Sequence, residues 1–124
     1  MNTDINEVEI NGVRYVRKDS VSNNPTESFE NMEYKIVSTF SAGVFAGYVK
    51  SRVKDEVVMV RARRLWYWDG AASLSQLSVD GVSKPQNCQF PCEVDNLVLL
   101  GVIEILSVTE KAKKSIDGVA IWKK

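Results

Sequence analysis

The sequence contains no histidine, and this absence excludes several of the commonest catalytic sites. The Ser-His-Asp and Cys-His arrangements both use an imidazole as the general base, and imidazole is also the commonest ligand of catalytic zinc. No pair of acidic residues stands out at a spacing that suits general acid and base catalysis. We therefore expect a protein that is not an enzyme and that carries no cofactor.

Cysteine is scarce as well, since Cys88 and Cys92 are the only two in the chain. Two thiols without histidine cannot supply the four ligands of a zinc site within one chain, so we expect no metal site. The pair is spaced C-x-x-x-C with Pro91 inside, which differs from the C-x-x-C spacing of redox centres. We expect two reduced, partly buried thiols in preference to a disulfide.

Long apolar runs and an excess of charge of one sign are also absent. The longest apolar stretch, residues 97–103, is far too short to span a bilayer, and Asp4, Glu7 and Glu9 interrupt any signal-peptide pattern at the N-terminus. The 16 basic and 16 acidic residues cancel, so the chain lacks the overall positive charge that attracts duplex nucleic acid. These features predict a cytoplasmic protein with no membrane partner and no duplex nucleic-acid partner.

The N-terminal part of the chain carries a hairpin pattern followed by a polar linker. Residues 7–18 alternate around Asn11-Gly12, the dipeptide that best fits a type I′ turn, because both central positions of that turn need a positive φ. The polar composition of residues 19–32 is typical of a linker. We therefore expect a hairpin extension over residues 1–18, a linker over residues 19–32 and one domain over residues 33–124.

The sequence pattern of residues 33–124 predicts mostly strands, with two helical segments. A helix is expected over residues 71–80, with Asp69 as its N-cap and Gly81 after its end, and a shorter one over residues 110–116, capped by Thr109. The strands are expected over residues 34–40, 44–50, 56–68, 93–108 with a bend at Gly101, and 119–123. This pattern predicts an α+β fold, a bent antiparallel sheet or small open barrel with one main helix, plus the N-terminal β-hairpin.

Residues 61–68 hold three arginines, two tryptophans and a tyrosine, and they are the most unusual stretch of the chain. Guanidinium and indole groups together can stack on planar ligands and neutralise phosphates. Strict alternation would place one half of the stretch on each face of a strand. One face would carry Arg64, Trp66 and Trp68, and the other Arg61, Arg63, Leu65 and Tyr67. The sequence leaves open which of these faces is the core.

Two interpretations of this stretch stand side by side. In the first, the arginines and tryptophans bind a nucleotide-type ligand, with Ser73 contributing at the start of the following helix. The ligand-binding residues would then be Arg61, Arg63, Arg64, Trp66, Trp68 and Ser73. In the second, the tryptophans fill the core, Ser73 is an ordinary cap, and the protein is a structural or protein–protein interaction module. The cluster of Lys111, Lys113 and Lys114 also has two interpretations: it binds an anionic partner, or it is a solvated helix face.

The same block carries a family resemblance. Arg63-Arg64-Leu65-Trp66-Tyr67-Trp68, followed by Gly70-Ala71-Ala72-Ser73-Leu74-Ser75-Gln76-Leu77, resembles an uncharacterised family of small tailed-phage proteins. The match continues weakly to Trp122 and covers residues 33–124. The resemblance implies a viral origin and no particular activity. We therefore expect a non-enzymatic phage accessory protein in the host cytoplasm that binds or sequesters a nucleotide, or else a host protein or a second copy of itself.

Overall fold

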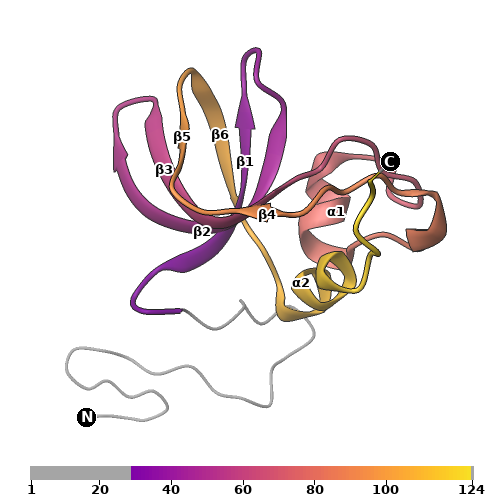
Figure 1. Ribbon diagram of the computed structural model, residues 1–124. Coiled ribbons are helices and arrows are strands. Elements are labelled where there is room, and N and C mark those ends of the chain that lie inside the picture. The colour runs from indigo at the N-terminus through magenta and orange to yellow at the C-terminus, as the bar shows by residue number, and fades with distance from the viewer. Residues whose placement is uncertain (1–28, 124) are drawn as a thin grey trace, which may run out of the picture.

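The structure is a computed structural model that describes residues 29–123. This part of the chain forms six strands and two α-helices. The elements are β1 (Glu33–Thr39), β2 (Val44–Val53), β3 (Glu56–Arg64), α1 (Leu74–Asp80), a 3-10 helix (Pro85–Asn87), β4 (Glu93–Val94), β5 (Leu97–Leu99), β6 (Val102–Ser107) and α2 (Glu110–Asp117). The expected α+β fold with a bent, open antiparallel sheet is confirmed (Figure 1). The predicted hairpin over residues 1–18 lies outside the described residues, and the division into extension, linker and domain stays a prediction.

The sheet has the order β4-β3-β2-β1-β6, and β5 also pairs with β3. The predicted bend at Gly101 is present, because this glycine adopts a φ of 73° between β5 and β6. On one side of the bend β5 pairs with β3, and on the other side β6 pairs with β1. A single segment thus runs from one part of the sheet to another, and the sheet curls around without closing (Figure 1).

A bulge in β3 changes which side chains share a face. Arg61 and Ala62 together lie opposite Gly47, because the register shifts between Ala46 and Tyr48, and Arg61 has a φ of 54°. A Cβ on Gly47 would lie 2.7 Å from the Ala62 Cα, so only glycine fits there. The prediction of strict alternation over residues 56–68 is therefore wrong beyond the bulge, and the strand ends at residue 64.

The two faces of the sheet belong to two separate cores. Ile36 and Val37, neighbours on β1, are both fully buried but lie in different cores because successive side chains of a strand point to opposite faces. The helix-side core joins the sheet to α1 and α2 and includes Leu77, Phe90 and Ile116. The inner core is enclosed by the curl of the sheet and comprises Val37, Phe45, Val57, Met59, Ala62 and Leu99. Full burial of one such side chain stabilises the fold by about 1.5–3 kcal/mol.

Both helices have well-formed ends. The Ser73 Oγ accepts a hydrogen bond from the Gln76 N–H at 3.1 Å, so the N-cap of α1 is Ser73, and the prediction of Asp69 is wrong. Gly81 ends this helix at a φ of 78°, as expected. The predicted cap of α2 is confirmed, because the Thr109 Oγ1 accepts from the Ala112 N–H at 3.0 Å.

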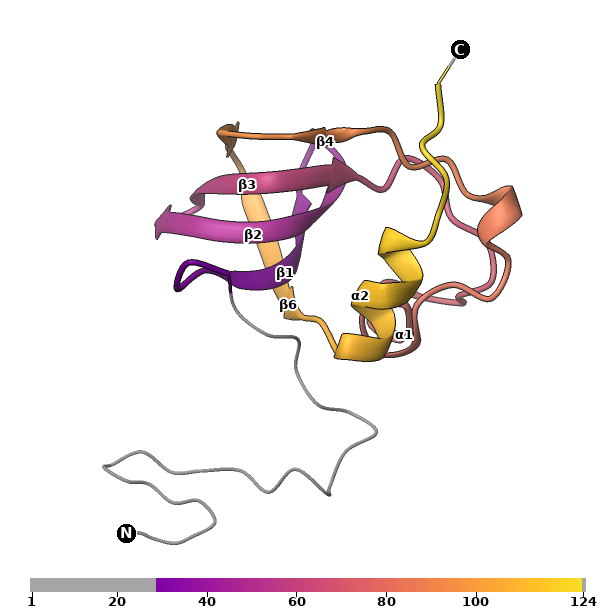
Figure 2. The ribbon, with the colours of Figure 1, turned by 60° about the horizontal axis from the view of Figure 1, so that its bottom comes forward.

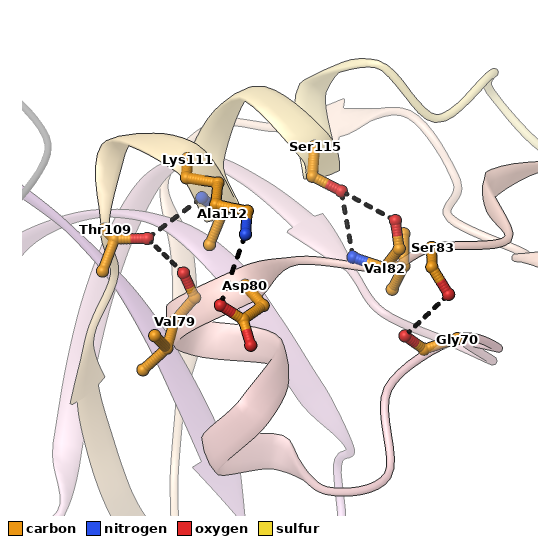
Figure 3. Close-up of polar contacts among 9 residues, drawn as sticks. All are labelled: Gly70, Val79, Asp80, Val82, Ser83, Thr109, Lys111, Ala112 and Ser115. Carbon is orange, nitrogen blue, oxygen red and sulfur yellow. Dashed lines mark hydrogen bonds and ion pairs between the residues drawn. The ribbon is translucent and has the colours of Figure 1, made fainter. Parts of the chain in front are cut away.

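Polar contacts fix the two helices to each other on the same side of the sheet (Figures 2 and 3). The Thr109 hydroxyl donates to the Val79 carbonyl at 2.6 Å. The Ser115 hydroxyl accepts from the Val82 N–H at 2.9 Å and donates to the Val82 carbonyl at 3.2 Å. A Cβ on Gly81 would lie 2.3 Å from the Ser115 Cβ, so the helices approach closely only because this residue is glycine. These contacts hold α2 in a fixed position beside the sheet.

The C-terminal segment runs past the end of β3 (Figure 2). The strand predicted over residues 119–123 is wrong, since the segment forms a single parallel bridge between Ile121 and Phe90. The Trp122 N–H donates to the Phe90 carbonyl at 2.9 Å.

Cys88 is buried, Cys92 is exposed, and both are free thiols. None of the helices in the described part of the chain has the length and hydrophobicity of a membrane span.

Candidate functional site

A cavity of about 380 Å³ lies between the sheet and α2. This volume is near the lower end of the range for small-molecule sites, roughly 300–1000 Å³. Its lining is mainly charged and aromatic: the cations Arg61, Arg63 and Lys113, the carboxylates Glu93 and Asp117, the phenols Tyr34 and Tyr48, and the aliphatic Val119 and Ile121. The cavity thus combines hydrogen-bond donors, acceptors and aromatic rings in a space suited to one small molecule.

Arg63 supplies a fixed positive charge in the wall of the cavity. Its side chain is buried, and its guanidinium donates to four carbonyl oxygens. These belong to Pro91 at 2.8 Å, Ile116 at 2.8 Å, Phe90 at 3.0 Å and Val119 at 2.7 Å. Burial lowers the pKa of Arg63, although a guanidinium keeps its proton in proteins. The arginine therefore ties the end of α2 to the segments around β4 and to the C-terminal segment.

Lys113 lies over the aromatic rings of the cavity. Its Nζ is 2.6 Å from the Asp117 Oδ2, one helical turn further along α2. The same ammonium lies 5.1 Å from the centroid of the Tyr34 ring and 6.0 Å from that of Tyr48, which are cation–π distances. Burial lowers the pKa of Lys113, but the hydrogen bond and the charge of Asp117 outweigh it and raise the pKa overall. This lysine is therefore a fully charged donor at neutral pH.

The Tyr34 hydroxyl is the buried neutral donor of the site. The side chain is 5% exposed, and among the described residues no hydrogen-bond partner reaches its hydroxyl. Burial raises the pKa of Tyr34, and the nearby charges of Asp117 and Glu93 raise it further. The phenol therefore stays protonated and can donate a hydrogen bond into the cavity. A buried hydroxyl without a partner costs about 1–3 kcal/mol, which a bound molecule in the cavity would offset.

Arg61 stands at the open side of the cavity. Its side chain is half-exposed, and its Nε is 4.0 Å from the Glu93 Oε1, so this ion pair is loose. The backbone N–H of Arg61 donates to the Asp95 Oδ1 at 2.8 Å, which helps to hold the bulge of β3. The guanidinium carbon lies 4.9 Å from the centroid of the Phe29 ring, so a cation–π contact and a loose ion pair hold the side chain.

The remaining residues of the predicted binding surface lie elsewhere. Arg64 packs its guanidinium 4.4 Å from the centroid of the Phe45 ring and donates to the Ala42 carbonyl, so it belongs with the inner core. Trp68 packs against the helix-side core. Ser73 caps α1. Of the six predicted residues, Arg61 and Arg63 line this cavity.

Trp66 belongs to a second surface, which we call the aromatic strip and define as Trp66, Tyr67, Ile121 and Trp122. These side chains are 62%, 52%, 57% and 36% exposed, respectively. They come from neighbouring segments, because Tyr67 pairs with Gln89 while the adjacent Phe90 pairs with Ile121. These neighbouring segments therefore carry four exposed large side chains, of which Ile121 also lines the cavity.

Sequence reasoning missed most of the cavity residues. Tyr34 and Lys113 are far apart in the chain and meet because the fold brings Lys113 of α2 over the rings of Tyr34 on β1 and Tyr48 on β2. The spacing of Lys113 and Asp117 was a usable signal, since residues four apart on a helix face the same side. Nothing in the strand pattern distinguishes Tyr34 or Tyr48 from ordinary core tyrosines.

The described residues contain no group of three histidine, cysteine, aspartate or glutamate side chains that could hold a metal ion. Among known families, residues 32–116 match the model described as a domain of unknown function (DUF6948). No curated protein and no solved structure matches the chain.

Proposed function

Because the chain belongs to the DUF6948 family of domains of unknown function, we propose its function from its own geometry. It is a non-enzymatic binding protein that holds a nucleotide-type ligand in the cavity between the sheet and α2. The observation that carries this proposal is the joint lining of one small cavity by three cations and two tyrosines.

Three properties of the cavity support a ligand with an anionic group. Arg61 and Lys113 are cationic and have exposed or partly exposed side chains, and the buried Arg63 adds a positive field behind them. The Tyr34 hydroxyl adds a neutral donor. Low-dielectric walls strengthen the attraction between such groups and an anion.

The proposal extends to the biological setting of the protein. The resemblance of the Arg63–Trp68 block to small tailed-phage proteins supports a phage accessory protein that acts in the host cytoplasm. A small non-enzymatic protein can act there by sequestering its ligand, since tight binding alone lowers the free concentration of that ligand. The zero net charge of the chain favours a small ligand over duplex nucleic acid.

Isothermal titration calorimetry of the full chain with the common nucleotides tests the proposal. We expect at least one nucleotide to bind and the variant Arg61→Gln to bind it roughly tenfold more weakly or worse, because a charge-assisted hydrogen bond is lost. Arg52→Gln is the matched control. Arg52 lies near the turn after β2 and donates to the Lys54 carbonyl, outside the cavity. Absence of heat with every nucleotide at millimolar concentration would refute the proposed function.

The aromatic strip supports a second candidate function, a protein–protein interaction module. Exposed aromatic side chains are enriched at the centres of protein interfaces. The partner would be a host protein or a second copy of this chain. Light scattering is the test for self-association, because Trp66→Ser should turn a dimer into a monomer while Phe40→Ser, at another exposed aromatic residue, should not. A monomer for the unmodified chain at high concentration would exclude self-association.

A further inference from the structure

Building on the proposed function, we propose that the ligand is a nucleoside monophosphate. Its terminal phosphate binds between Arg61, Lys113 and the Tyr34 hydroxyl, and its sugar hydroxyls donate to Glu93 and Asp117. The argument starts from the donors that the folded chain leaves available in the cavity.

The cavity offers three donors that are not tied to the main chain. Arg63 is not one of them, since its guanidinium already donates to four carbonyl oxygens. The Arg61 side chain makes a loose contact with Glu93 and lies over the Phe29 ring at 4.9 Å from its centroid. The Lys113 ammonium pairs with Asp117 and lies over the tyrosine rings, so neither cation donates to a main-chain carbonyl within the described residues. The third donor is the hydroxyl of Tyr34, a residue that is 5% exposed, and this hydroxyl lacks a partner within residues 29–123.

Three donors match the terminal group of a phosphate monoester. A monoester carries three strong acceptor oxygens and a charge of about −1.5 to −2 at neutral pH. A diester, as in a nucleic-acid backbone or a cyclic nucleotide, has two such oxygens and a single charge. The buried charge of Arg63 adds to the preference for the more highly charged group. The geometry therefore favours a monoester over a diester.

The carboxylates specify the other end of the ligand. When the phosphate engages Lys113 and Arg61, it competes with Asp117 and Glu93 for the same cations. Glu93 and Asp117 have side chains that are 53% and 46% exposed, and donor groups of the ligand can form charge-assisted hydrogen bonds with them. The hydroxyl groups of a ribose supply such donors, whereas inorganic phosphate has no second group to offer. The cavity volume of about 380 Å³ suits one such molecule rather than a polymer.

The test compares four probes on the full chain by calorimetry: adenosine 5′-monophosphate, adenosine 3′,5′-cyclic monophosphate, adenosine and inorganic phosphate, with the other nucleoside monophosphates as further probes. We expect the monophosphate to bind at least tenfold more tightly than the cyclic diester, the nucleoside or the inorganic ion. In Tyr34→Phe and in Lys113→Gln the affinity for the monophosphate should fall roughly tenfold. Tyr67→Phe and Lys111→Gln are the matched controls, because both residues lie outside the cavity.

Two outcomes separate the inference from the proposed function. If nucleotides bind and Arg61→Gln weakens them, but the cyclic diester binds as well as the monophosphate, the monoester assignment is wrong and the binding function stands. If no nucleotide binds, the proposed function fails and this inference fails with it. Lys113→Gln keeps the test decisive if Tyr34→Phe does not fold, since Lys113 is on the surface of α2. Equal affinity of both variants and the unmodified chain would overturn the assigned contacts.

Discussion

At the scale of single residues, the three arginines of the 61–64 stretch have three different environments. Arg63 is buried among carbonyl oxygens, Arg64 stacks on Phe45 outside the cavity, and Arg61 is half-exposed at the open side of the cavity. The residue type is the same in each case. The environment differs because the bulge at Arg61 sets the direction of each following side chain.

The buried guanidinium of Arg63 predicts that Arg63→Lys lowers the free energy of unfolding by about 2–4 kcal/mol. A lysine ammonium has no planar fork and cannot reach the carbonyls of Pro91, Phe90 and Val119 together, so buried acceptors lose their partners. Urea denaturation measures the change. Arg61→Lys, at a half-exposed position, should stay within about 0.5 kcal/mol. Equal losses in the two variants would contradict the role assigned to Arg63.

Tyr34 predicts a loss of stability in alkali. Its pKa is raised in the folded state, so the tyrosine stays protonated there while the unfolded chain ionises above about pH 10. The protonated Tyr34 therefore makes its full contribution to the free energy of unfolding below that pH. As the pH rises toward the folded-state pKa, the free energy of unfolding falls by about 1.4 kcal/mol per pH unit. Melting temperatures between pH 8 and pH 11 measure the effect. The decline should be shallower in Tyr34→Phe than in Tyr67→Phe, and parallel declines would contradict it.

At the scale of elements, one bulge and one helix pair position the cavity. The bulge of β3 turns Arg63 toward the helix-side core while Ala62 stays in the inner core. The contacts of Thr109 and Ser115 with the end of α1 hold α2 where Lys113 overlies the sheet (Figure 3). Both features require a glycine where two segments come closest: Gly47 faces the backbone of Ala62 in the bulge, and Gly81 faces Ser115 between the helices.

The bulge predicts that Gly47→Ala destabilises the fold by about 1–3 kcal/mol or more, because the new methyl group would meet the backbone of Ala62 at 2.7 Å. The register of β2 and β3 should shift, so ligand affinity should fall along with stability. Thermal unfolding followed by circular dichroism measures the first effect. Gly118→Ala is the control, since its nearest contact is 3.3 Å and its φ is −79°. A melting temperature equal to that of Gly118→Ala would contradict the close approach.

At the scale of the whole molecule, the described residues 29–123 contain two hydrophobic cores. The inner core runs from Val37 to Leu99, and the buried residues of the helix-side core run from Tyr34 to Val119. All the cavity residues fall within the same span. The region from residue 29 onward therefore contains the buried apolar area that a cooperative fold needs.

We accordingly expect the chain shortened to residues 29–124 to unfold in one cooperative transition, with a melting temperature within about 5 °C of the full chain, a shift that corresponds to about 1 kcal/mol in a domain of this size. Differential scanning calorimetry measures both quantities. Its affinity for nucleotides should match that of the full chain, because every described residue that lines the cavity is retained. A broad transition or a loss of binding would show that residues 1–28 contribute to the fold.

The sequence by itself determined the fold class, the strand positions of β1 and β2, the bend at Gly101 and the Thr109 cap, because local patterns and turn residues specify them. It also singled out Arg61 and Arg63. Only the tertiary structure decided that these two face a cavity with Tyr34 and Lys113, whereas Arg64 and Trp68 pack elsewhere. Two tertiary features are the physical reason. One extra residue in β3 inverts the alternation that the sequence pattern assumes, and the packing of α2 brings Lys113 next to Tyr34, which lies 79 positions earlier in the chain.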